Sequence, residues 1–291
     1  MPTPLRSRGF IAAALLPALI VFILFAIVPI LWSVYYGFFQ WKGMGQPKFI
    51  GFGNYSAMLQ DPVFWRALKN NLILVVSAIA GQIPIALVGA LLLTANGWFN
   101  RLIRSALFMP MVLSTVVIGM IWGYIYNSQF GLLNEALSLL GLESWTRAWL
   151  SDPKVNMYAV SIPINWSNIG PYLIIFIAAL QNISSEIHDA AAIDGASGWR
   201  KLRSVTLPMV WSTVVVTLVL CIAGSLKAFD HVIVMTGGGP AKSTELLATY
   251  MYNNTFAVYR YGYGSAVSTM IIVISLLLIA LNLLVTRRKN G

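Results

Sequence analysis

The sequence has few charged residues. Asp, Glu, Lys and Arg make up 10% of its 291 residues, whereas soluble domains carry about 25%. Apolar and aromatic side chains of the AVILMFWYC set make up 58%. A chain with so little charge cannot cover its surface with groups that water solvates. The composition therefore excludes an ordinary soluble protein and predicts an integral membrane protein.

Cysteine and histidine are also scarce. The single cysteine, Cys221, excludes a disulfide framework and a metal site built from several cysteines. Cys221 lies inside an apolar run, and we expect it to be buried and inert. A membrane-bound enzyme would need His, Asp or Glu clustered near one membrane face. The two histidines, His188 and His231, fall in segments on opposite sides of the predicted bundle, so we do not expect an enzyme.

No phosphate-binding loop is present. Residues 236–244, TGGGPAKST, look like the Gly-x4-Gly-Lys-Ser/Thr loop that cradles nucleotide phosphates. Counted back from Lys242, however, the two required glycine positions hold Ala241 and Thr236. Pro240 also removes a backbone N–H that such a loop would use. We expect a glycine-rich turn here, and no nucleotide or other cofactor bound by this chain.

The apolar residues form six runs long enough to cross a bilayer core, which needs about 20 residues per helix. Alternation of apolar and polar residues is absent, so a β-barrel is not indicated. The first run is too long for a signal peptide and contains Pro17 and Pro29, and we take it as an uncleaved span. The expected fold is an all-α membrane bundle, with a tail over 1–9 and helices near 10–38, 71–95, 105–126, 155–182, 207–229 and 264–286.

The basic residues indicate the orientation. The net charge is +10, but it is scattered between apolar runs rather than gathered on one face, which excludes a nucleic-acid partner. The loops near 39–70, 127–154 and 230–263 are longer and hold most of the acids. The positive-inside rule places both termini in the cytoplasm and these longer loops outside. The short basic segments on the inner side contain Arg6, Arg8, Arg101, Arg104, Arg200, Lys201, Arg203, Arg287, Arg288 and Lys289.

The loop at 184–208 is too long to be only a connection. Ser184 or Ser185 can cap a short helix whose first turns carry Glu186 and Asp189. Alanines then favour the helix and leave a surface that a partner can approach closely. Gly195 suits the left-handed position that ends a helix. We predict two short helices joined at Gly195.

The spacing in this loop resembles the EAA signature of ABC importer permeases. Asp189-Ala190-Ala191 is followed by Asp194-Gly195 and then, after nine residues, by Val205-Thr206-Leu207-Pro208. Asp189 replaces the usual Glu and Val205 the usual Ile. Further marks are Ile50-Gly51-Phe52-Gly53-Asn54-Tyr55 and Met235-Thr236-Gly237-Gly238-Gly239-Pro240, which resemble the first permease of maltose and glycerol-3-phosphate systems.

This resemblance implies a type I ABC importer permease fold with a core from 68 to 285. It implies that the 184–208 loop couples the chain to an ATPase through Glu186, Asp189, Ala190, Ala191, Asp194, Gly195, Leu207 and Pro208. ATP and Mg²⁺ would bind two ATPase subunits. The other implied partners are a second homologous permease and an extracytoplasmic solute-binding protein, in a bacterial cytoplasmic membrane.

Polar residues inside the spans indicate a substrate path, because they are costly in lipid unless they face a cavity or a neighbour. The densest group comes directly before Pro171, which we expect to kink the fourth span. Neutral amides and aromatic rings suit a sugar, although the same residues could instead form hydrogen bonds between helices. Gln82, in the second span, is a weaker candidate. The candidates are Asn165, Trp166, Asn168, Tyr172, Ser225 and Lys227.

Two further alternatives remain. A polyol or glycerol phosphate is the second choice of substrate, but a phosphate would need fixed cations, and the spans offer only Lys227. That residue could also extend its ammonium outward. A secondary transporter would usually keep ion-coupling acids inside its spans, and none lies deep in these six. The sequence thus favours a permease for a neutral sugar or oligosaccharide.

Overall fold

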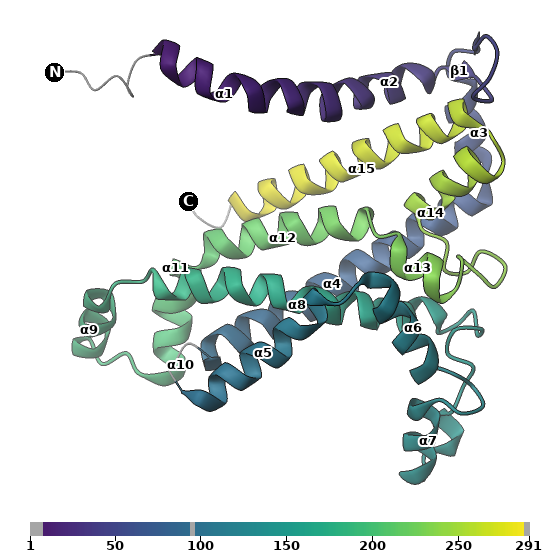
Figure 1. Ribbon diagram of the computed structural model, residues 1–291. Coiled ribbons are helices and arrows are strands. Elements are labelled where there is room, and N and C mark those ends of the chain that lie inside the picture. The colour runs from purple at the N-terminus through teal and green to yellow at the C-terminus, as the bar shows by residue number, and fades with distance from the viewer. Residues whose placement is uncertain (1–7, 94–96, 288–291) are drawn as a thin grey trace. The chain divides into compact units, whose positions relative to one another are not determined.

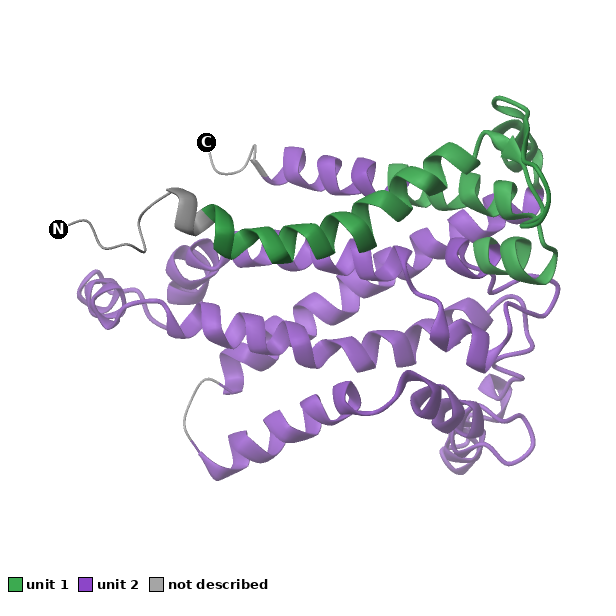
Figure 2. Ribbon diagram, turned by 45° about the horizontal axis from the view of Figure 1, so that its top comes forward, with its two compact units in different colours: residues 1–61, 251–273 green, residues 62–250, 274–291 purple. Residues whose placement is uncertain are grey.

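The computed structural model describes residues 8–93 and 97–287 (Figure 1). They divide into two compact units, which Figure 2 colours separately. One contains residues 1–61 and 251–273, and the other residues 62–250 and 274–291. The start of the predicted tail, residues 94 and 95 of the second predicted span, and the basic residues Arg6, Arg288 and Lys289 lie outside the described residues.

The first unit begins with one long apolar helical rod. Its three consecutive parts are α1 (Arg8–Phe22), a π-helical turn (Ile23–Ile27) and α2 (Val28–Tyr36). Its strands β1 (Phe39–Gln40) and β2 (Lys48–Phe49) pair antiparallel and precede α3 (Gly53–Gln60). Asn54 is buried and donates hydrogen bonds to the carbonyls of Gly37 and Phe39, both at 2.9 Å. The asparagine of the Gly-x-x-Asn-Tyr motif therefore ties α3 to the end of α2.

The second unit holds most of the bundle, together with a turn at Glu143–Trp145, a π-helical turn at Leu202–Thr206 and the C-terminal half of α15. The first unit also contains the π-helical turn Asn253–Ala257, the end of α14 and the N-terminal half of α15. The remaining helices are α4 (Pro62–Leu93), α5 (Trp98–Val112), α6 (Thr115–Ile125), α7 (Leu132–Leu139), α8 (Asn156–Gln181), α9 (Ser185–Ile193), α10 (Gly198–Lys201), α11 (Leu207–Met209), α12 (Trp211–Leu226), α13 (Asp230–Met235), α14 (Leu247–Tyr252) and α15 (Tyr261–Arg287).

The core of this unit lies where α4 packs against α8 and α12. Ala78, Ala86 and Ala90 of α4 are completely buried, and small side chains let helix backbones approach closely in membranes. Leu173 and Phe176 of α8 fill the space between them and are also completely buried. This contact fixes the two helices that carry most of the candidate polar residues.

The structure changes the bounds of several predicted segments. Four described helical segments are long and apolar enough to span a membrane, or six if each of two bent helix pairs is one span. Residues 62–70 belong to α4, so the predicted outer loop 39–70 ends nine residues early; Pro62 fits the first helical turn, where its missing N–H is not needed. Pro171, where we expect a kink, does not interrupt the helix, because α8 continues through Pro163 and Pro171.

Two predicted spans are bent. The segment predicted over 105–126 consists of α5 and α6, which meet at 103°. Pro110 lies two residues before the end of α5, and Leu113 and Ser114 adopt extended backbone between the helices. The segment predicted over 207–229 contains α12 and, before it, the end of a helical stretch over 198–209. This stretch and α12 meet at 64°. The first bend lies beside the candidate site.

Candidate functional site

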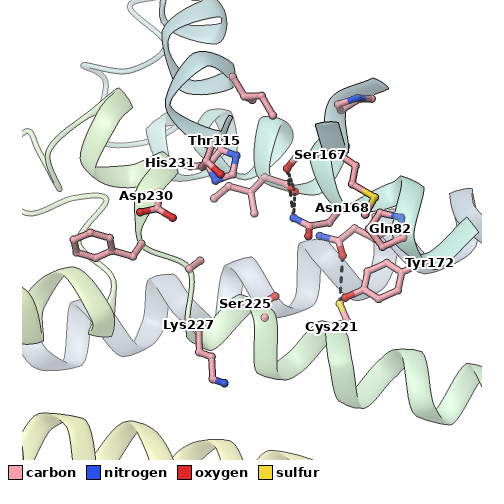
Figure 3. Close-up of a pocket in the computed structure, with 18 of the residues that line it drawn as sticks. Gln82, Thr115, Ser167, Asn168, Tyr172, Cys221, Ser225, Lys227, Asp230 and His231 are labelled. Atoms are coloured by element: carbon pink, nitrogen blue, oxygen red, sulfur yellow. Dashed lines mark hydrogen bonds between the residues drawn. The ribbon is translucent and has the colours of Figure 1, made fainter. Parts of the chain in front are cut away.

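A cavity of about 290 Å³ lies among the helices of the second unit (Figure 3). Its walls come from α4, α8, α12 and α13 and from the bend between α5 and α6. Without that bend, a straight helix would continue past this space. The side chains with polar groups or a thiol that line the cavity are Gln82, Thr115, Ser167, Asn168, Tyr172, Cys221, Ser225, Lys227, Asp230 and His231.

The α8 wall presents Ser167, Asn168 and Tyr172. Asn168 donates from Nδ2 to the carbonyl of Ile164 at 2.7 Å, which fixes the direction of its amide. Tyr172 lies one turn further along and is buried. These side chains are thus held in place by the helix that carries them.

One end of the cavity lies between α4 and α12. Gln82 and Ser225 are almost completely buried, and both line the cavity. The thiol of Cys221 lies 3.8 Å from Oε1 of Gln82. Cys221 is buried as expected, in the hydrophobic core cluster, and it also forms part of the cavity wall.

Asn165 and Trp166 do not line this cavity. Asn165 accepts a hydrogen bond from Nε2 of Gln82 at 2.9 Å and donates to Oγ of Ser77 at 3.3 Å. Its amide therefore joins α8 to α4, which is the interhelical alternative. The ring of Trp166 packs edge-on against Trp122 of α6, with centroids 6.0 Å apart. Of the predicted path residues, the structure gathers Asn168, Tyr172, Ser225 and Lys227, with Gln82, around one space.

Charged and titratable groups lie at the other end. Lys227 is one of the lining residues, but its side chain points away from the other labelled polar groups (Figure 3). Asp230 and His231, at the start of α13, line the cavity as well. Burial lowers the pKa of His231, and the neighbouring Asp230 carboxylate partly opposes that shift. We therefore expect a neutral imidazole here near pH 7.

The sequence pattern does not indicate that His231 and Thr115 line a cavity. It places His231 in the outer loop 230–263, because it does not show that α13 folds back beside α6 and α8. Thr115 begins α6 directly after the bend. Pro110 followed closely by Ser114 and Thr115 was a usable signal for a broken helix, since proline and small polar residues cluster at such breaks.

The TGGGPAKST segment forms an ordered turn after α13. Gly237, Gly238, Ala241 and Lys242 all have positive φ. The hydroxyls of Thr236 and Thr244 lie 2.7 Å apart across it, closing the turn. Lys242 forms an ion pair at 3.0 Å with the buried carboxylate of Glu245. The lysine of the apparent phosphate motif is therefore engaged within the turn.

Asparagines of the long helices hold this turn and the residues after it. We call residues 236–247 the outer strap. Asn70 of α4 donates to the carbonyls of Ser243 and Glu245 at 2.8 and 2.9 Å. Asn71 accepts from the N–H of Leu247 at 2.7 Å and donates to the carbonyl of Ser225 at 2.9 Å. The outer strap and the α12 wall of the cavity are thus attached to the same helix.

The 184–208 loop lies at the opposite end of the second unit from α13 (Figure 1). Ser184 is the N-cap residue of α9, without a side-chain capping bond, and Gly195 has φ +70° and ends the helix as predicted. Glu186, Asp189, Ala190 and Asp194 are exposed, whereas Ala191 is buried against the chain itself. Leu207 is half-buried and Pro208 exposed at α11.

Two large apolar side chains of this loop face solvent. Ile193 is 87% exposed and Trp199 is 72% exposed.

Comparison with known proteins assigns the family. Residues 82–291 match the family described as binding-protein-dependent transport system inner membrane component. The chain belongs to this family. The matched region starts at Gln82 on the cavity wall and includes the cavity helices, the outer strap and the 184–208 loop. The chain is therefore an inner membrane component that crosses the membrane several times, as the six-span, all-α interpretation predicted.

Individual relatives agree along nearly the whole chain. The chain is 36% identical to a probable ABC transporter permease of Bacillus subtilis, with 91% of each chain covered. It is 33% identical to a diacetylchitobiose uptake permease of Streptomyces coelicolor, covering 98% of this chain and 84% of that one. A lactose transport permease of Rhizobium radiobacter is also 33% identical, with 94% and 93% covered.

A solved structure shares the fold. A chain of a bacterial alginate ABC transporter, crystallised with an alginate pentasaccharide-bound periplasmic protein, superposes with a TM-score of 0.82 at 22% identity, covering 98% of this chain and 96% of that one. The ABC importer permease fold expected from the EAA-like loop is confirmed.

Proposed function

We propose that this chain is the pore-forming permease subunit of an ATP-driven, binding-protein-dependent importer for a neutral sugar or oligosaccharide. The observation that carries the proposal is the cavity bounded by Gln82, Asn168, Tyr172 and Ser225. Amides and hydroxyls offer both donors and acceptors, which match the hydroxyls of a sugar. Polar groups fixed beside apolar side chains orient a small molecule in its site.

The charges around the cavity favour a neutral substrate. The Lys227 ammonium points away from the cavity's labelled polar groups (Figure 3). Asp230 supplies a negative charge at the same end, and burial favours the neutral form of His231. A glycerol phosphate or another strongly anionic substrate would lack a fixed cation to pair with. Similarity to the lactose and diacetylchitobiose permeases supports the same choice.

An acidic saccharide is the second candidate. Lys227 is one of the lining residues, and one relative, 32% identical, is a sulfoquinovosyl glycerol transport permease of Agrobacterium fabrum. A rotation of the Lys227 side chain would bring its charge toward the substrate. The polyol alternative would use the same amides and hydroxyls. Family membership selects a binding-protein-dependent importer over a secondary transporter.

Energy would enter through the 184–208 loop. The exposed Ile193 and Trp199, with the acids Glu186, Asp189 and Asp194, form a mixed apolar and acidic surface that suits a cleft on an ATPase subunit. ATP and Mg²⁺ would bind two such ATPase subunits, and this chain would have no catalytic role. Closure of the ATPase pair would move α9 and turn the cavity from one side of the membrane to the other.

The orientation follows from the basic residues. α10 and the start of α5 lie at the α9 end of the second unit (Figure 1). These segments and the π-helical turn after α10 carry Arg101, Arg200, Lys201 and Arg203. The positive-inside rule then places α9 and both termini in the cytoplasm. The outer strap would face an extracytoplasmic solute-binding protein. Since one permease supplies only part of a transport path, a second homologous permease would complete the assembly.

Sugar uptake by the reconstituted importer tests the proposal. The chain would be placed in proteoliposomes with the second permease, the ATPase and the binding protein encoded beside it. In Asn168→Ala, the loss of one amide bond to the sugar is expected to raise the half-saturating sugar concentration about fivefold, because such a bond contributes about 1 kcal/mol. ATP hydrolysis without sugar should not change, since Asn168 is distant from α9.

Asn182→Ala is the matched control. Asn182 is an exposed amide at the end of the same helix and is distant from the cavity, so uptake should remain that of the wild type. Equal uptake curves for the two variants would show that this cavity is not the sugar path. Uptake of a glycerol phosphate in preference to neutral sugars would favour the alternative substrate.

A further inference from the structure

The second unit carries a second, quite different cavity on its surface. It is an apolar groove of about 630 Å³ between α4 and α5, which is within the size range of ligand sites. Nine of its ten lining residues are apolar, and Asn100 is the tenth. Val88 and Leu92 on its α4 side are more than half exposed, so the groove is open to the surroundings. The sugar path does not use this space.

The groove matches one leaflet of a bilayer in depth. On α4 its lining extends from Leu93 to Pro84, a rise of nine positions, or about 14 Å at 1.5 Å per residue. On α5 it extends from Phe99 to Leu107, or about 12 Å. Half of a hydrocarbon core is about 15 Å. The groove therefore has the length that one acyl chain occupies.

One end of the groove lies at the headgroup level. Trp98 and Phe99, in the first turn of α5, are both mostly exposed, and aromatic side chains of this kind concentrate at the membrane–water interface. The polar Asn100 lines the groove at the same end. This end is the one that carries α9, on the side we place in the cytoplasm (Figure 1).

A cation is fixed at that end. Arg104 of α5 donates from Nη2 to the carbonyl of Leu93, the last residue of α4 and itself a lining residue. Arg104 does not itself line the groove, but this bond holds its guanidinium beside Leu93, at the end of the groove. Its planar array of N–H donors matches the geometry of a phosphate. Arg101, one residue beyond Asn100, is exposed and adds positive charge to the same surface.

We propose that the α4–α5 groove binds an anionic phospholipid of the adjacent leaflet, with an acyl chain along α4 and α5 and the phosphate at Arg104 and Asn100. Basic pockets between helices on the cytoplasmic side recognise such headgroups. The assignment of that leaflet to the cytoplasm rests on the proposed function, but the site itself does not depend on transport.

Native mass spectrometry of the full-length chain tests this site. The chain would be purified in mixed micelles that contain equal amounts of phosphatidylglycerol and phosphatidylcholine. The wild type is expected to retain phosphatidylglycerol in preference. Val88→Trp, which fills the groove, should lower that retention about fivefold, the change that corresponds to about 1 kcal/mol of binding free energy. Val216→Trp is the control, because Val216 of α12 is as exposed, 54% against 52%, but lies outside the groove.

Charge variants test the headgroup. Arg104→Gln keeps a donor for the Leu93 carbonyl but removes the charge, so preference for phosphatidylglycerol should disappear. Arg104→Lys should restore most of it. Circular dichroism and gel filtration would confirm that each variant is folded. Equal lipid retention by Val88→Trp and Val216→Trp would overturn the proposal.

A different result would identify another occupant. If Val88→Trp leaves lipid retention unchanged but abolishes copurification of the second permease, the groove is a subunit interface and the lipid proposal is wrong. Lipid retention is measured without sugar, ATP or the ATPase. Failure of the lipid site therefore leaves the proposed transport function intact, and failure of sugar uptake leaves the lipid site intact.

Discussion

Asn71 joins the outer strap to the wall of the cavity through a single buried amide. The side chain is completely buried, donates to the carbonyl of Ser225 at 2.9 Å and accepts from the N–H of Leu247 at 2.7 Å. Ser225 lines the cavity on α12, and Leu247 follows the turn after α13. We expect Asn71→Leu, which has a similar branched shape, to remove both bonds. The N–H of Leu247 then loses its partner, whereas the carbonyl of Ser225 still accepts from the N–H of Ala228 at 3.4 Å.

The magnitude follows from the group left unpaired. Leaving the buried N–H of Leu247 without a partner costs about 1–3 kcal/mol, so we expect the folded chain to be destabilised by about that amount. This corresponds to a rise of about 5- to 150-fold in the unfolded fraction. Unfolding in mixed micelles with increasing SDS would measure it. Asn182→Leu, at an exposed position, should stay within about 0.5 kcal/mol of the wild type.

Cys221 provides a local measurement in the same variant. It is the sole cysteine of the chain and lies one turn before Ser225 on α12, where it is buried. If Asn71 positions this part of α12, Asn71→Leu should speed modification of the thiol by a water-soluble methanethiosulfonate under native conditions. A variant that loses less than about 1 kcal/mol and labels at the wild-type rate would refute the argument, because the two bonds would then carry no net stabilisation.

Two glycine substitutions test other parts of the chain. Gly195→Val places a branched side chain at φ +70°, and we expect about 1–2 kcal/mol of strain at the end of α9 and loss of ATPase copurification. Gly123→Ala, in open space within α6, is the control. Normal ATPase binding and uptake in Gly195→Val would contradict the coupling role. Gly238→Ala would bring a Cβ within 2.5 Å of Oε2 of the buried Glu245 at a φ of +88°. A lower unfolding temperature is expected, and an unchanged one would show that the turn rearranges without cost.

Local features of the sequence were predicted well. Gly195 ends α9 in the left-handed conformation, because without a Cβ it has no steric penalty there. The TGGGPAKST turn does not have the glycine register of a phosphate loop, and the register follows from the sequence alone. The all-α fold followed from apolar run length, since a chain of 20 apolar residues must satisfy its backbone within a helix in lipid.

The site was predicted only in part. Asn165 and Asn168 are three residues apart on one helix, and both were reasonable candidates for the path. The structure assigns them differently because Gln82 of α4 binds Asn165, whereas Asn168 faces the cavity. The sequence did not indicate that Gln82, 83 residues away, would lie beside Asn165. The bend between α5 and α6 was missed for a related reason, because its apolar segment is long enough to pass as one straight span.

The sequence by itself determined the membrane class, the all-α architecture, the two-helix 184–208 loop and the absence of a phosphate-loop register. Each of these depends on composition or on residues within a few turns of one another, where local backbone preferences and hydropathy decide. The tertiary structure alone decided which polar side chains share the cavity, that Asn71 links Ser225 to Leu247, and that α4 and α5 leave a groove with Arg104 at its end. The Asn71 bonds join residues 154 and 176 positions apart, and such contacts form only when the helices have packed.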